Sequence, residues 1–243
     1  MKKIRLDKLL FEKKLVKNIK EASNLIYEKK IRIPNYNSKL LFEHTMINKD
    51  TEIKILDKKF VSRGGDKLDN FLIQKNIIIK EKICLDVGAS TGGFTDALLQ
   101  RGAKKVYCVD VGKSQLHSKI SKNKRVEYYE NINAKYNFSL DSNKVDIVVV
   151  DVSFISVNKI IPQLKIFLSK NSYLIILIKP QFEAKKDEVE IGGVIKNISL
   201  IPKILDSVIK NIQKNNLKLI DLKKSELKGR KGNQEFFAIF KLS

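Results

Sequence analysis

Beyond residue 66, apolar runs of strand length alternate with segments of helical spacing, and this alternation restricts the fold more than any other feature of the 243-residue chain. Sheets built from such an alternation are doubly wound and mostly parallel. The expected strands are 83–87, 106–110, 126–129, 145–151 and 173–179, and the expected helices are 93–100, 114–121, 157–168 and 200–215. No helix separates the last two strands, 217–223 and 235–242, so we expect one of them to pair antiparallel.

The first 56 residues show a different pattern and are basic, with 12 Lys and 2 Arg against 7 acidic residues. Leu6, Leu9 and Leu10 have helical spacing, and a second helix is expected near 20–29. Apolar runs at 31–33 and 51–56 are expected to be strands. This pattern predicts a small α+β domain over residues 1–56.

The two patterns meet at residues 57–65, which combine charged side chains with the pair Gly64-Gly65. Glycine pairs and charges between periodic segments are typical of a linker. A helix that starts near Asp66 is expected to follow and to bury Leu68 and Phe71. We therefore predict a linker over 57–65 and a larger domain over 66–243.

The charge of the chain favours an anionic partner. Its 48 Lys and Arg residues outnumber 27 Asp and Glu residues, for a net charge of +21. Nucleic acid is the first choice for such an excess, and an acidic membrane surface is the second. No uncharged apolar stretch approaches 18 residues, and the N-terminus has no apolar leader. We therefore expect a soluble cytoplasmic protein that does not enter a membrane.

Two cysteines and two histidines are scattered along the chain. Cys84 and Cys108 lie in apolar runs, where buried free thiols are the ordinary interpretation. A disulfide scaffold is excluded, and no metal-ligand spacing is present, so no metal is expected.

A glycine-rich turn after the first strand of the larger domain is the strongest local motif. It runs from Leu85 to Thr95, follows an apolar strand and opens a helix. Glycines there let a nucleotide approach the backbone, and the absence of a P-loop lysine argues against a triphosphate. Asp110 ends the next strand, where a carboxylate can bind ribose hydroxyls. This arrangement is typical of S-adenosylmethionine (SAM) sites, and the residues expected to bind the cofactor are Asp86, Gly88, Ser90, Gly92, Gly93, Phe94, Asp110, Asn133 and Asp151.

Two charged residues end later strands of the same predicted sheet. Asp151 ends the fourth strand, and Lys179 ends the fifth because Pro180 disfavours helix at the residue before it. The carboxyl ends of strands form the ligand crevice in open α/β sheets. Both side chains are therefore expected to face bound substrate.

These motifs resemble a known family over almost the whole chain. Residues 1–56 resemble an S4 RNA-binding domain, and residues from 60 onward resemble an FtsJ/RrmJ-type methyltransferase. The combination is similar to the TlyA family of ribosomal RNA 2′-O-methyltransferases, often labelled hemolysin A. The shared motifs are 61–68, 86–94, 178–183 and the segment from 228 to 236. The resemblance implies a Rossmann-like SAM-dependent methyltransferase with an N-terminal S4 domain, acting on cytidine either in 23S rRNA alone or in both 23S and 16S rRNA.

The resemblance also implies specific site residues. The family's Lys-Asp-Lys-Glu tetrad corresponds to Lys67, Asp151, Lys179 and Glu235. The S4 half implies RNA contacts by basic residues, and those expected to bind RNA are Arg5, Lys8, Lys20, Lys29, Arg32 and Arg63. This half departs from the usual S4 pattern at two places. Lys30 replaces the glycine before the hairpin, and residues 34–37 replace the Asn-Gly turn, so the sequence does not predict the conformation of the hairpin.

Methyl transfer to a ribose hydroxyl needs an aligned oxygen that loses its proton. Lys179 is expected to orient that hydroxyl and either to accept the proton or to stabilise the developing alkoxide by its charge. The sequence leaves this choice open, as it does the modified nucleotide and the oligomeric state.

Two other functions compete with methylation. A ribosome-binding assembly factor would keep the methyltransferase fold without turnover; the intact tetrad argues against it, and assays of SAM binding and methyl incorporation separate the two functions. A pore-forming hemolysin would lyse liposomes, and the chain has no span, secretion signal or strongly apolar amphipathic stretch to support that activity.

Overall fold

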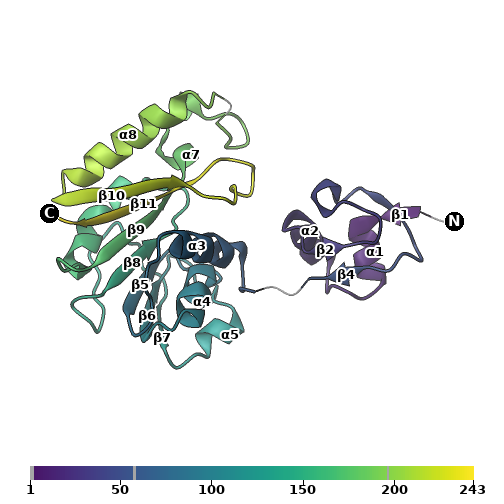
Figure 1. The fold of residues 1–243 in the computed structure, drawn as a ribbon, viewed down its shortest axis with the longest axis horizontal. Helices are drawn as coiled ribbons and strands as arrows, with labels where there is room; N and C mark the ends of the chain where they lie inside the picture. The colour runs from purple at the N-terminus through teal and green to yellow at the C-terminus, as the bar shows by residue number, and fades with distance from the viewer. Residues whose placement is uncertain (1–2, 57–58, 196) are drawn as a thin grey trace. The chain divides into compact units, whose positions relative to one another are not determined.

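The computed structural model describes residues 3–56, 59–195 and 197–243 (Figure 1). The chain divides into two compact units, Met1–Lys59 and Phe60–Ser243. Each unit has a core of its own, and each is described separately below.

In its described residues, the small unit contains two short α-helices, a 3₁₀ turn η1 (Ser38–Leu40) and two short antiparallel strand pairs. Its helices are α1 (Leu6–Glu12) and α2 (Ile19–Tyr27), as the leucine spacing predicts. Strand β2 (Ile31–Arg32) pairs with β4 (Lys54–Ile55), which lie within the two predicted runs. The second pair, β1 (Lys3–Arg5) with β3 (Met46–Asn48), was not predicted. Buried aliphatic side chains from both helices, such as Leu9 and Ile26, form the core.

The predicted linker is wrong over residues 60–65, because these residues belong to the larger unit. Helix α3 (Arg63–Gln74) begins before Asp66, and Phe60 is buried. A Cβ at Gly65 would lie 2.4 Å from the Phe60 side chain and 2.9 Å from the carbonyl oxygen of Gly93. Gly65 is thus a packing requirement of the helix start, whereas a Cβ at Gly64 would meet its neighbours only at 3.4 Å or more. Residues 57 and 58 lie outside the described residues.

A seven-stranded sheet forms the centre of the larger unit, with the order β10-β11-β9-β8-β5-β6-β7. Adjacent strands from β9 to β7 are parallel, and β11 is antiparallel to both of its neighbours, as expected for the final strands. The strands are β5 (Ile83–Val87), β6 (Lys105–Val109), β7 (Val126–Tyr129), β8 (Ile147–Val150), β9 (Tyr173–Ile178), β10 (Leu217–Lys224) and β11 (Phe236–Leu242).

Helices cover both faces of this sheet (Figure 1). Alternate residues of β8 and β9 point to opposite faces because side chains alternate along a strand. One set packs with α6 (Ile161–Leu164) and α8 (Leu200–Gln213), and the other set packs with α3 and α4 (Gly93–Gln100). The predicted doubly wound α/β fold is confirmed.

Two predicted helices are shorter than expected. The segment 157–168 is divided into a 3₁₀ turn η2 (Val157–Lys159), α6 and a second 3₁₀ turn η3 (Lys165–Phe167). Pro162 lacks the N–H that a continuous helix would donate to residue 158. Only α5 (Ser118–Ser121) forms within 114–121, because Ser114 has a φ of +53°. Two short turns, α7 (Pro180–Glu183) and η4 (Lys186–Glu188), follow β9. Among the described residues, no helix is both long and apolar enough to cross a membrane.

Candidate active site

The turn between β5 and α4 has the backbone that its glycines predict. Gly88 has a φ of +84°, and a Cβ there would lie 2.6 Å from the carbonyl oxygen of Asp151. Gly92 has a φ of +89° and packs against Leu116. Side chains are strained in this region of φ and would also clash here. The glycines therefore bring the ends of β5 and β8 into contact at one edge of the sheet.

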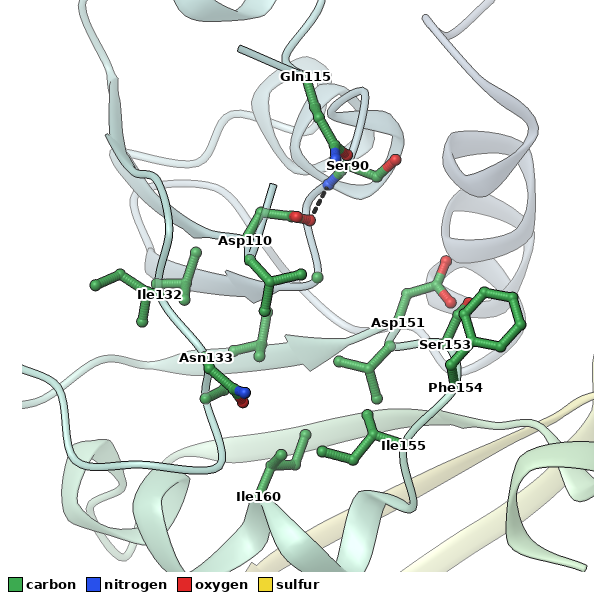
Figure 2. A pocket seen from close by; sticks show the side chains of 16 residues that line it. Ser90, Asp110, Gln115, Ile132, Asn133, Asp151, Ser153, Phe154, Ile155 and Ile160 are labelled. Atoms are coloured by element: carbon green, nitrogen blue, oxygen red, sulfur yellow. Dashed lines mark hydrogen bonds between the residues drawn. The ribbon is translucent and has the colours of Figure 1, made fainter. Parts of the chain in front are cut away.

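Asp110 is fixed beside this turn by two backbone donors. Its Oδ2 accepts a hydrogen bond from the Ser90 N–H at 2.7 Å, drawn in Figure 2, and its Oδ1 accepts one from the Gly112 N–H at 2.7 Å. A carboxylate has about four acceptor positions, so two remain for the hydroxyls of a ribose. Binding of ribose by Asp110 stays a prediction, and this geometry leaves the carboxylate the acceptor positions that it needs.

A cavity of about 310 Å³ lies at the carboxyl ends of β5, β6 and β8 (Figure 2). Five of the predicted cofactor residues line it, namely Gly88, Ser90, Asp110, Asn133 and Asp151. Most of the remaining wall is apolar and includes Val109, Val111, Ile132, Val152, Phe154, Ile155 and Ile160. Few polar groups set in apolar walls are typical of a small-molecule site. The Asp110 carboxylate and the apolar wall of this cavity fit an adenosine group.

Asp86 and Gly92 do not line this cavity. Asp86 is fully buried beneath the turn, where its Oδ2 accepts a hydrogen bond from the Thr95 hydroxyl at 2.6 Å. Burial raises the pKa of Asp86 to about 7, although the Thr95 hydrogen bond opposes this shift. Its Oδ1 has no hydrogen-bond partner among the described residues. Asp86 and Gly92 were expected to contact the cofactor directly, but the structure places both behind the wall of the cavity, where they support the turn.

A second cavity adjoins the first and shares four residues with it, Gly88, Ser90, Asp151 and Ser153. Gly93 and Phe94 line this second cavity, not the first. Lys67 and Lys179 line it as well. Asp151 therefore forms a wall that is common to both cavities.

Two ion pairs occupy this second site. Lys179 Nζ lies 2.6 Å from Asp151 Oδ1 and donates a hydrogen bond to Ser153 Oγ at 2.9 Å. Lys67 Nζ lies 2.6 Å from Glu235 Oε2. Side-chain exposure is 11% for Lys179, 22% for Asp151, 10% for Lys67 and 4% for Glu235, so both pairs are largely shielded from solvent. The four residues of the predicted tetrad thus form two ammonium–carboxylate pairs, with Glu235 behind Lys67.

Comparison with known proteins assigns this arrangement to a family. Residues 60–242 match the FtsJ-like methyltransferase family. The chain belongs to the FtsJ-like methyltransferases. This membership confirms the predicted fold class, enzyme class and SAM as the cofactor.

Individual relatives place this FtsJ-like methyltransferase in the TlyA/hemolysin A group. It is 44% identical to "Hemolysin A" of Brachyspira hyodysenteriae, over 79% of this chain and 82% of that one. It is 34% identical to the Mycobacterium tuberculosis "16S/23S rRNA (cytidine-2'-O)-methyltransferase TlyA", over 97% and 89%. A solved Streptococcus thermophilus structure described as a hemolysin is 33% identical, with a TM-score of 0.76, over 100% and 90%.

Sequence reasoning missed two residues beside Lys179 in this FtsJ-like methyltransferase. Ser153 accepts the hydrogen bond from Lys179 and lines both cavities. Phe154 is 92% exposed at a φ of +62°, with its ring 5.0 Å from that of Phe182. Their position in the loop just after a strand end was the available signal, because such loops line the ligand crevice.

The basic residues predicted to bind RNA fall into two groups. Arg5, Lys29 and Arg63 already donate hydrogen bonds within the protein, to the Asp7 carboxylate, to the Leu41 carbonyl and to the Lys228 carbonyl. The other three, Lys8, Lys20 and Arg32, are exposed on the small unit. Only this second group keeps its donors for a partner without rearrangement.

Proposed function

We propose that the chain methylates the 2′-hydroxyl of cytidine in ribosomal RNA, with SAM as the methyl donor. One observation carries the proposal: an adenosine-sized cavity shares Asp151 with a second cavity that holds two shielded lysine–carboxylate pairs. The TlyA relative, whose described activity is cytidine 2′-O-methylation of 16S and 23S rRNA, supports the choice of substrate. We expect 23S rRNA as a substrate and test 16S rRNA beside it.

The residues of the second cavity account for the chemistry. When bound, SAM supplies a methyl group on a positively charged sulfur. Lys179 is held by Asp151 and Ser153, so its ammonium has a fixed position from which to hydrogen-bond the ribose oxygen. The Lys179 ammonium lies 2.6 Å from the Asp151 carboxylate, and this pairing favours the second of its two expected roles. In that role the ammonium stabilises the negative charge that develops on the ribose oxygen. Lys67, paired with Glu235, adds a second positive charge at the same cavity.

The small unit is proposed to supply affinity for RNA. Its 12 Lys and 2 Arg exceed its 7 acidic residues over 1–56, and Lys8, Lys20 and Arg32 are exposed. Phosphate contacts by such side chains weaken steeply with salt. We therefore propose an S4-like RNA-binding role for this unit and a cytoplasmic location, where ribosomal subunits are the substrate.

Methyl incorporation into purified ribosomal subunits tests this function. The full chain is incubated with tritiated SAM and 50S or 30S subunits, and 2′-O-methylated positions are mapped. Lys179→Ala is expected to lower the rate by about 10²–10³-fold while SAM binding is retained. Lys170→Ala, an exposed lysine outside both cavities, is the control and should act like the parent. A parent that binds SAM and rRNA without transferring methyl would instead be an assembly factor.

A further inference from the structure

A pair of exposed aromatic rings on the small unit is not used by the methyl-transfer site. Phe42 and His44 lie with ring centroids 5.8 Å apart and planes inclined by 11°. Phe42 is 51% exposed and His44 is also exposed, so both rings retain surface that a ligand can cover. Aromatic side chains of this size are usually buried, so an exposed parallel pair indicates a binding surface.

The turn that carries these rings is held rigidly. The Phe42 N–H donates to Thr45 Oγ1 at 2.8 Å, and the Thr45 N–H donates to the Phe42 carbonyl at 3.0 Å. The turn is also docked on the start of α1, because the Leu6 N–H donates to the Thr45 carbonyl at 2.9 Å and the Asp7 N–H donates to the Glu43 carbonyl at 3.2 Å. The two rings are therefore presented in a fixed orientation, which lowers the entropy lost on binding.

Charged side chains of both signs lie at this turn, because the exposed Glu43 stands between the two aromatic residues and basic side chains lie around it. Lys29 Nζ lies 5.1 Å from the centroid of the Phe42 ring, and Lys29 is anchored there by its bond to the Leu41 carbonyl. Arg5 pairs with Met46, the residue just after the turn, and is exposed. Lys8 is exposed on the first turn of α1. Parallel aromatic rings with lysine and arginine beside them match the chemistry of a single nucleic-acid strand, which offers flat bases between phosphates.

We propose that Phe42 and His44 are a stacking platform for unpaired RNA bases, flanked by a phosphate contact from Lys8. This inference rests on the proposed RNA substrate and adds a preference to it. The platform recognises splayed bases of a loop or bulge and not a closed duplex, because the base faces of a duplex are covered by their neighbours. Stacking then selects the single-stranded region, while the lysines supply affinity without sequence preference.

Binding of a labelled single-stranded RNA of twelve nucleotides, and of the same sequence as a duplex, tests the platform in the full chain. Phe42→Ala is expected to weaken single-strand binding about tenfold, and to leave duplex binding and the slope of log K against log salt unchanged, since no charge is lost. Phe42→Tyr should retain the parent affinity. Lys8→Gln should instead lower the salt slope by about one.

Phe11→Ala is the matched control, because Phe11 is 48% exposed on α1 of the same unit. Equal losses for Phe11→Ala and Phe42→Ala, equal losses on single strand and duplex, or parent-like binding by Phe42→Ala would each overturn the platform. Methylation of subunits by the parent is measured separately. Absence of methylation by the parent would refute the proposed function. If the parent methylates subunits and Phe42→Ala binds single-stranded RNA as the parent does, only the platform is refuted.

Discussion

Asp86 makes the stability of the larger unit depend on pH in an unusual direction. Burial, the largest cause, and the nearby charges of Asp151 and Asp110 raise the pKa of this carboxyl from 3.8 to about 7, against the hydrogen bond from Thr95. The folded state then holds a proton that the unfolded state releases above about pH 4. The contribution of Asp86 to the free energy of unfolding is therefore fully present below about pH 4 and is lost as the pH rises toward 7.

The magnitude follows from the shift. Each pKa unit corresponds to about 1.4 kcal/mol, so between pH 5 and pH 7 the folded chain loses on the order of 3 kcal/mol from this group. Asp86 is fully buried, so solvent does not screen the effect. Asp86→Asn removes the titration, and its free energy of unfolding should fall less between pH 5 and pH 8 than that of the parent.

Urea unfolding at pH 5 and pH 8, followed by circular dichroism, measures this difference. Asp206→Asn is the control, because Asp206 is exposed on α8 and its removal should leave the parent's pH difference in place. Equal pH differences for the parent and Asp86→Asn would refute the reasoning. The absolute stability of Asp86→Asn is not the criterion, since a new amide N–H is buried at the same time.

Three further predictions concern the two cavities. Asp110→Ala should weaken SAM binding by about tenfold or more in calorimetry, because two ribose hydrogen bonds are lost, and an unchanged affinity would exclude the assignment. Gly229→Ala places a Cβ 2.5 Å from Glu235 Oε1 and should displace the partner of Lys67, so the methylation rate should fall at least tenfold at unchanged SAM affinity. Ser153→Ala removes the hydroxyl that positions Lys179 and should lower kcat by about tenfold with little change in SAM affinity; an equal loss of SAM affinity would show a role in the first cavity instead.

The elements that the sequence predicts best are those whose pattern reflects a buried environment. Strands β5, β6, β8 and β9 appear in the sequence as apolar runs because both of their faces are covered, and the charged residue that follows such a run marks the crevice. Asp110, Asp151 and Lys179 were found in this way.

The errors have equally local causes. Gly64 and Gly65 suggested a linker because glycine is a poor helix former, yet the close approach of Phe60 and Gly93 requires a residue without a side chain at position 65. The break at Pro162 was hidden by the apolar spacing around it. Ser153 has only its place in the loop after β8 as a signal, and the three-dimensional position of Lys179 is needed to give its hydroxyl a partner.

The ion pair between Lys67 and Glu235 joins α3, the first helix of the larger unit, to the residue before β11, 168 positions later. The residues of the adenosine-sized cavity all fall between 87 and 160, and are therefore synthesised well before Glu235. Strand β11 is also an inner strand, and β10 pairs only with it within the sheet. A nascent chain thus contains every residue of its nucleotide cavity before the carboxylate that pairs with Lys67 is made. On the role proposed for this pair, methyl transfer requires the docked β10–β11 hairpin, so activity reports completed folding.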